Sequence, residues 1–216
     1  MNGIFNMDNG FFSAVGKLVD IVIVSLMWIL LMIPIITIGP ATSAMYYCMV
    51  KVIRRERGYL TREFISAFKM NFKVGTLTSI ILAFMYFVLI FDLTWARQME
   101  GIPGFILVSV FNSMLFLITC IALYAFPILS RFRIKTKQLL KTSLFMAMKH
   151  LPSTILIAII VAFFAIATYL INILFIVTPG LCCLLVSFLF ERIFKKYMPE
   201  KAEDEENNVK DEWYLE

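Results

Sequence analysis

Long apolar blocks separated by short basic segments dominate this chain. Four blocks approach or exceed the ~20 residues that a helix needs to cross ~30 Å of hydrocarbon. Lipid cannot satisfy backbone polar groups, and continuous blocks lack the alternation of barrel strands, so the pattern predicts transmembrane helices. The four blocks cover residues 18–38, 74–95, 104–129 and 151–177.

Two shorter apolar runs, 41–53 and 181–193, are ambiguous when each is taken alone, because runs of this length also form re-entrant or interfacial segments. The distribution of Lys and Arg residues favours a topology in which both short runs cross the membrane. With six spans and both termini inside, nineteen of the 20 Lys and Arg residues lie on one side and only Arg97 on the other, as the positive-inside rule requires. The sequence therefore predicts an all-α, polytopic membrane helix bundle of six transmembrane helices, two of them short.

The composition supports a membrane protein. Hydrophobic residues make up 61% of the chain and charged residues 16%, whereas a soluble domain has about half and about a quarter. The basic residues follow the predicted inner face, which argues against nucleic-acid binding. All four cysteines lie in apolar segments, so we expect small buried side chains rather than a disulfide framework.

Two segments that follow inward-going spans, 60–73 and 137–150, have the spacing of amphipathic helices. They are predicted to lie on the cytoplasmic side at the lipid headgroups. Their lysines would then reach anionic headgroups, or the helices would dock a partner, and the two roles are compatible. The apolar positions are Phe64, Ala67, Phe68 and Phe72 in the first segment, and Leu140, Leu144 and Met148 in the second.

A weak internal repeat relates these two segments. Each unit is an inward-going helix, a basic turn, an amphipathic helix and an outward-going helix. A displacement of 77 residues aligns Ser66 with Ser143, Phe68 with Phe145, and Arg54 with Arg131.

Glycine and proline mark predicted tight outer turns at Gly39-Pro40 and at Pro179-Gly180, each before a short apolar run. Glycine can adopt positive φ, and proline fixes φ at a helix start. Short segments with such breaks in matching positions also point to transporter sites. A transporter is therefore an open alternative.

The chain changes character near its end. Residues 199–216 carry eight acidic residues against two lysines and few apolar residues, a composition typical of disorder. The sequence thus predicts a membrane helical domain over 1–198 and an acidic disordered cytoplasmic tail over 199–216.

Four polar residues fall inside the predicted spans: Asp20, Asp92, Asn112 and Asn172. Polar groups at membrane depth are costly and serve as functional candidates. Asp20 suits the positive end of a helix, Asp92 lies near the outer interface, and the two asparagines suit hydrogen bonds between helices. We favour structural roles for all four, while a transporter would place Asp20, Asn112 or Asn172 in a hydrated cavity.

Signatures of enzymes are absent from the sequence. His150 is the only histidine, and neither a second metal ligand nor a general base accompanies it. Nucleophile-elbow, metalloprotease, phosphate-loop and dinucleotide-binding motifs are also missing. We therefore expect no catalytic, cofactor-binding or metal residues, no cofactor, and a protein that is not an enzyme.

Several short motifs are spread over residues 1–197. They are Gly3 to Phe12, Gly16 to Asp20, Pro34-Ile-Ile-Thr-Ile-Gly-Pro-Ala-Thr42, Phe64-Ile-Ser-Ala-Phe-Lys-Met-Asn-Phe-Lys73, Phe126-Pro127, Arg131-Phe132 and Lys149-His150-Leu151-Pro152. Together these motifs resemble the YesL-like family of uncharacterised bacterial integral membrane proteins, from which the acidic tail departs. The resemblance implies a multi-pass protein of the bacterial cell membrane, often encoded beside sugar-uptake ABC transporters and glycan-degrading enzymes, and it supplies no established catalytic residues.

The leading hypothesis is a non-enzymatic accessory in the assembly, stability or regulation of a carbohydrate ABC uptake system, with ABC permease subunits or a second copy as partner. An autonomous small-solute transporter or channel is the alternative, and a scaffold that senses anionic lipid is a third. Cytoplasmic docking is assigned to Phe68, Asn71, Phe72, Arg131, Phe132 and His150.

Overall fold

The computed structural model describes residues 10–197, and every regular element there is a helix. The predicted tail, 199–216, lies outside the described residues. In chain order the elements are α1 (Gly10–Met32), η1 (Ile35–Thr37), α2 (Ile38–Cys48), the π-helical η2 (Met49–Arg54), α3 (Leu60–Ala96), α4 (Gly101–Arg131), α5 (Thr136–Lys149), α6 (Leu151–Leu170), η3 (Asn172–Ile176) and α7 (Thr178–Phe194).

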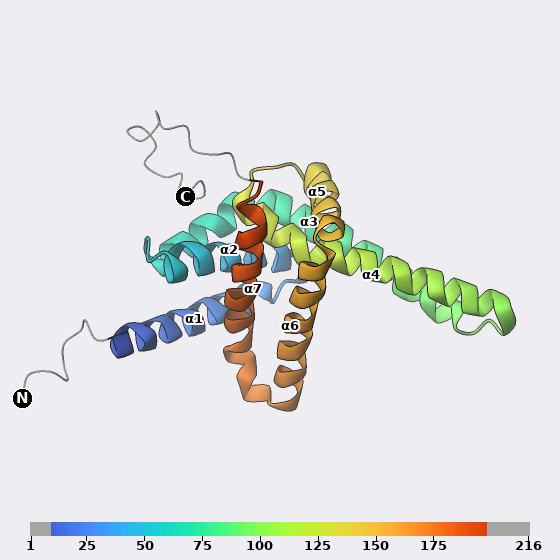
Figure 1. The fold of residues 1–216 in the computed structure, drawn as a ribbon, viewed down its shortest axis with the longest axis horizontal. Helices are drawn as coiled ribbons and strands as arrows, with labels where there is room; N and C mark the ends of the chain where they lie inside the picture. Colours follow the sequence, from blue (N-terminus) through green and yellow to red (C-terminus); the bar gives the residue numbers. More distant parts are fainter. Residues whose placement is uncertain (1–9, 198–216) are drawn as a thin grey trace, which may run out of the picture.

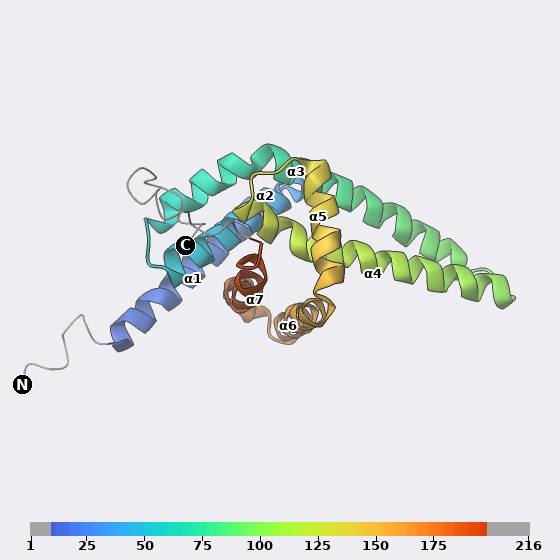
Figure 2. The ribbon, with the colours of Figure 1, turned by 45° about the horizontal axis from the view of Figure 1, so that its top comes forward.

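The long helices form two hairpins that point in different directions (Figures 1 and 2). α3 and α4 lie side by side, and their far ends project beyond the rest of the molecule, while α6 and α7 form a second hairpin that runs across the first. α2 lies at the centre, where it contacts α1, α3, α4 and α7. The helices therefore do not lie parallel to one another as in a simple bundle.

Four helices among the described residues are long and apolar enough to cross a membrane, namely α1, α3, α4 and α6. α2 has 11 residues and α7 has 17, fewer than the ~20 that an upright span needs. The all-α class is confirmed, and the apolar helices fit a multi-pass membrane protein. The count of six spans stays a prediction.

The first predicted amphipathic segment is not a separate helix. It forms the beginning of α3, a continuous helix of 37 residues that bends near its middle (Figure 2). At 1.5 Å per residue α3 is about 55 Å long, so about 25 Å of it exceeds a ~30 Å hydrocarbon core. Phe64 and Ala67 are buried, whereas Phe68 is half-buried and Phe72 is exposed.

The second amphipathic segment is a helix of its own, α5, because the chain leaves helical geometry at His150 (φ −114°, ψ 44°). Of its predicted apolar positions, Leu144 and Met148 are exposed, and their place at the lipid headgroups stays a prediction. α5 has apolar residues on several sides, and only tertiary contacts decide which side is covered. The buried residues are Leu139, Ser143, Met146 and Ala147.

Two glycines allow the backbones of α2 and α3 to come together. A Cβ on Gly39 would lie 2.5 Å from the carbonyl oxygen of Gly75, and a Cβ on Gly75 would lie 2.8 Å from the backbone nitrogen of Pro40. Small residues at such crossings are typical of packed membrane helices. The contact fixes α2 against the middle of α3.

Candidate functional site

The most unusual polar cluster lies where α2, α4 and α7 approach their C-terminal ends. Arg131 of α4 donates two hydrogen bonds to the carboxylate of Glu191 of α7, from Nε to Oε1 at 2.8 Å and from Nη2 to Oε2. The hydroxyl of Tyr46 in α2 donates to the same Oε1 at 3.0 Å. One carboxylate thus joins three helices that are far apart in the sequence.

This ion pair is buried. Arg131 is 6% exposed and Tyr46 is 1% exposed, while Glu191 lies at the edge of the cluster. The ring of Phe190 packs edge-on against Tyr46 at 6.0 Å between centroids and stacks on Phe194 at 5.5 Å. In such an apolar setting both charges lose hydration, so each depends on the other and on its hydrogen bonds.

A second set of hydrogen bonds connects the same region to α5 and α6. The hydroxyls of Tyr124 in α4 and Thr154 in α6 lie 2.9 Å apart, and Thr154 also donates to the carbonyl of Ala147 at 2.9 Å. All three residues are buried. The interior therefore ties the C-terminal half of α4 to every helix that follows it.

Arg54 of η2 adds a contact to α7. Its Nη1 donates to the carbonyl and the hydroxyl of Ser187, each at 3.2 Å, and its guanidinium carbon lies 4.0 Å from the centroid of the Phe188 ring. A guanidinium over an aromatic face is favourable when it is partly desolvated. Two arginines from different helices thus meet successive turns of α7.

The chemistry of this cluster is that of a structural lock. It contains a guanidinium, a carboxylate and a phenol held by mutual hydrogen bonds. In the part of the chain that the structure describes, no group of three or more His, Cys, Asp or Glu residues could hold a metal ion. The arrangement stabilises the positions of α2, α4 and α7 relative to one another.

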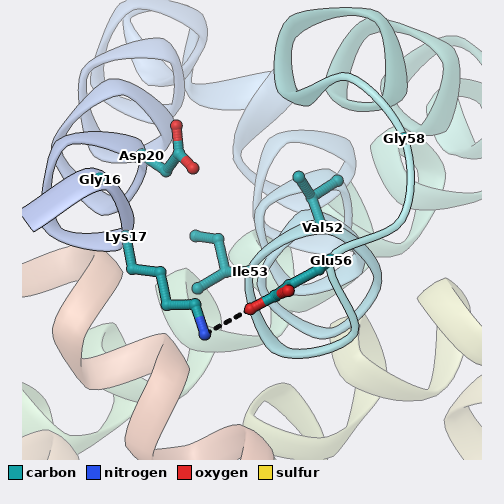
Figure 3. A pocket seen from close by; sticks show the side chains of 7 residues that line it. All are labelled: Gly16, Lys17, Asp20, Val52, Ile53, Glu56 and Gly58. Carbon is teal, nitrogen blue, oxygen red and sulfur yellow. Dashed lines mark ion pairs between the residues drawn. The ribbon is translucent and has the colours of Figure 1, made fainter. Parts of the chain in front are cut away.

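A shallow, open depression of about 300 Å³ lies between α1 and the segment that follows η2 (Figure 3). Lys17 forms an ion pair with Glu56 at 2.6 Å across it, and Figure 3 shows the carboxylate of Asp20 turned away from that pair. The charge and hydrogen bond of Lys17 lower the pKa of Glu56. Because the pair is well exposed, it contributes little to stability.

The structure separates the six predicted docking residues. Asn71 is buried and donates to Ser43 at 3.1 Å, and Arg131 is buried in its ion pair. These two are therefore turned inward and cannot touch a partner in this conformation. Phe68 and Phe72 lie on the outer side of α3 with ring centroids 5.5 Å apart.

The other two docking candidates lie at the edge of the core. Phe132 is half-buried against Phe194, with ring centroids 5.8 Å apart. The Nε2 of His150 lies 3.0 Å from the hydroxyl of Tyr197. Partial burial lowers the pKa of His150, and the charges of Lys196 and Lys149 lower it further.

The predicted turn residues serve mainly in packing. Gly39 and Pro40 lie inside the start of α2, and Gly39 does not adopt positive φ, so the interpretation of Gly39 as a turn glycine was wrong. Pro179 lies in the first turn of α7. The backbone N–H of Gly180 donates to Ser25 of α1 at 3.0 Å, and this close approach needs a residue without a side chain.

Among the described residues, neither Asn112 nor Asn172 forms a hydrogen bond to another helix, and the structural role of these asparagines stays a prediction. Asn112 is exposed and donates to the carbonyl of Val108 in its own helix at 2.8 Å. Asn172 is exposed at the start of η3. Asp92 is half-buried near the end of α3, and Asp20 lines the depression.

Sequence reasoning missed Glu191 and Tyr46. Glu191 was overlooked because it lies near the basic end of a short apolar run, where a charge appears unremarkable. The available signal was its isolation, since it is the only carboxylate between Gly101 and Tyr197. Nothing in the sequence around Tyr46 distinguishes it from its neighbour Tyr47.

Comparison with known proteins gives one match. No curated protein and no solved structure matches the chain. Residues 21–93, from α1 to near the end of α3, match the model of a family described as a protein of unknown function, DUF624. The matched region contains Tyr46, the contact between Gly39 and Gly75, and the Phe68–Phe72 pair. Residues 21–93 are therefore similar to this family, in agreement with the YesL-like resemblance of the sequence motifs.

Proposed function

We propose that the protein is a non-enzymatic membrane accessory that binds the permease subunits of a carbohydrate ABC uptake system and assists its assembly, stability or regulation. The nature of the partner rests on the family resemblance. The site rests on an aromatic pair of α3, the half-buried Phe68 and the exposed Phe72. We place this pair in the part of the helix that exceeds the thickness of the hydrocarbon core.

The Phe68–Phe72 pair has the properties of a docking site. Ile65 and Phe72 are exposed on the side of α3 that faces away from the buried core. Phe68 lies between that side and the core, and it is partly buried against the core. Ile65 is 42% exposed and Phe72 is 40% exposed, and Lys69 is exposed beside them. Phenylalanine is among the residues enriched at protein interfaces. Under the predicted topology this surface faces the cytoplasm.

The test is recovery of the partner. The tagged protein is crosslinked lightly in native membranes, purified in mild detergent, and its partners are identified by mass spectrometry. We expect near-stoichiometric permease subunits with the wild-type chain and their loss with Phe68→Ala/Phe72→Ala. The matched control is Phe87→Ala/Phe91→Ala, which changes two exposed phenylalanines of the same helix at the same spacing.

Three results of this experiment bear on different parts of the proposal. Permease recovery that is unchanged in the Phe68→Ala/Phe72→Ala variant, with a wild-type unfolding temperature, would overturn the docking site. Equal loss in both double variants would indicate a general effect of α3. Failure of the wild-type chain to recover a permease would overturn the accessory role itself.

Autonomous transport is the second candidate, and Asp20 supports it. Asp20 lines the open depression beside α1, whereas Asn112 and Asn172 face outward. A transport route would therefore start at Asp20. We expect a route of this kind to let a water-soluble maleimide reach Asp20→Cys from both sides of the membrane, and labelling from the inner side alone would count against transport.

A further inference from the structure

A short polar patch interrupts the outward side of α4. Ser109, Asn112 and Ser113 are all exposed, and each hydrogen-bonds to its own helix. The acceptors are the carbonyl oxygens of Phe105, Val108 and Ser109, at 2.8, 2.8 and 2.9 Å. We call these three residues the α4 polar patch.

The patch lies at membrane depth. Asn112 is eight residues from Gly104, where the apolar block begins, which is about 12 Å along the helix axis. The exposed apolar residues on the same side of the helix are Phe105 and Phe116. A carboxamide in such surroundings has no water to bind, so its polar atoms require a protein partner.

The internal hydrogen bonds of α4 satisfy the serines but not the asparagine. A serine hydroxyl has one donor, and the carbonyl four residues earlier takes it. A carboxamide has two N–H donors and an acceptor oxygen. Among the described residues, Asn112 makes one hydrogen bond, to Val108. One N–H and the carbonyl oxygen of Asn112 therefore remain for a group outside the described chain.

The geometry points to a second copy of this chain as that group: we propose that the protein dimerises through the α4 polar patch. A carboxamide carries both a donor and an acceptor, so two copies of Asn112 related by a two-fold axis can exchange hydrogen bonds. Ser109 and Ser113 are small and four residues apart, which lets two backbones approach. The projecting α3–α4 hairpin leaves this part of α4 clear of the other helices (Figure 1).

The test uses the purified protein alone, so it does not depend on any permease. Cys48, Cys120, Cys182 and Cys183 are replaced by alanine, Ser113→Cys is added, and the protein is oxidised in lipid nanodiscs. We expect a disulfide-linked dimer on a denaturing gel. Mass measurement of the cysteine-free chain by light scattering in mild detergent should also give a dimer.

The variant Asn112→Leu then tests how much the carboxamide contributes to dimerisation. Two exchanged hydrogen bonds, each worth about threefold in the association constant, predict a drop of about tenfold. Asn172→Leu is the matched control, because Asn172 is also exposed but lies in η3, away from α4, and it should leave the dimer unchanged.

Several results would overturn the proposal. A monomeric mass with no crosslink at position 113 would do so, as would a dimer that Asn112→Leu leaves intact. A crosslink in native membranes from position 113 to a permease subunit, with no self-crosslink, would assign the patch to the other protein.

Discussion

Arg131 and Glu191 form one unit, and the stability of the protein should depend on the pair more than on either charge. Removing one partner of a buried ion pair leaves an uncompensated charge and costs about 3–5 kcal/mol, whereas replacing both with apolar residues is often neutral. We expect Arg131→Met and Glu191→Met each to lower the unfolding temperature strongly in detergent. The double variant should recover most of the loss.

Lys17 and Glu56 provide the control for this prediction. They also form an ion pair, but both side chains are well exposed, so Lys17→Met should change the unfolding temperature little. If Glu191→Met were as mild as Lys17→Met, the buried cluster would not be a structural lock.

His150 should make stability depend on pH. Its pKa is lowered in the folded protein, so the unfolded chain binds a proton more readily. The contribution of His150 is therefore fully present above about pH 6.5 and is lost as the pH falls through the lowered folded value.

The measurement compares unfolding temperatures of the wild type and His150→Gln from about pH 7.5 to 5, across the range in which histidine titrates. We expect the wild type to lose stability relative to the variant as the pH falls. Glutamine keeps a polar partner for Tyr197 without the titration. A difference that is constant over the whole range would mean that His150 has the same pKa in both states.

Individual side chains show where sequence reasoning stops. The buried positions of Phe64 and Ala67 follow from helical spacing, because one side of an amphipathic helix must be covered. The partner of Arg131 does not follow, since Glu191 is 60 residues away and only the packing of α4 against α7 brings them together. Long-range pairs of this kind have no local signature.

At the scale of helices, the crossing of α2 and α3 should be the least tolerant of added volume. Gly75→Ala would bring a methyl group to 2.8 Å from the backbone of Pro40, and overpacking typically costs about 1–3 kcal/mol. Gly16→Ala is the matched change in α1, where nothing lies within 4 Å of the new Cβ. We expect Gly75→Ala to lower the unfolding temperature.

Gly16→Ala should leave stability unchanged or raise it by up to about 1 kcal/mol, because alanine is the better helix former. Thermal unfolding of both variants in the same detergent makes the comparison. Equal effects of the two substitutions on the unfolding temperature would show that α2 and α3 can move apart without a loss of stability.

The positions of the helices were predictable, but their ends were not. Apolar blocks located α1, α4 and α6, because each block must be helical to lie in lipid. Only α4 lies close to its block at both ends, since α1 ends at Met32 and α6 at Leu170, before the ends of their blocks. The boundary predicted near residue 73 does not exist, since neither proline nor a capping residue separates the amphipathic segment from the span, and α3 continues through both. Pro152, in the first turn of α6, accompanies the break after α5.

At the scale of the whole molecule, the two hairpins differ in length as well as direction. α6 has 20 residues, about 30 Å, and matches the hydrocarbon core when upright. α4 has 31 residues, about 46 Å, and a helix longer than the core tilts. The α3–α4 and α6–α7 hairpins point in clearly different directions in Figure 1, so the two pairs cannot both stand upright in one bilayer.

The C-terminal ends of α2, α4 and α7 meet in the buried cluster, and the distribution of charge predicts that all three ends lie on the inner side. We therefore expect α2 and α7 to cross the membrane despite their short length. Single cysteines in the cysteine-free chain test this in intact cells with an impermeant maleimide. Ile36→Cys, Gln98→Cys and Asn172→Cys should label from outside.

Thr61 and Lys135 are both exposed, and the predicted topology places them on the inner side. Thr61→Cys and Lys135→Cys should therefore label only after lysis. Ile36 and Thr61 flank α2 and η2, so labelling of both from one side would mean that this segment does not cross. Lys195→Cys makes the same comparison with Asn172→Cys across α7. If the two cysteines of each pair label from opposite sides, α2 and α7 both cross and the protein has six spans. Helices of 11 and 17 residues can then cross only if packed helix ends, and not lipid, surround the polar groups at the inner interface.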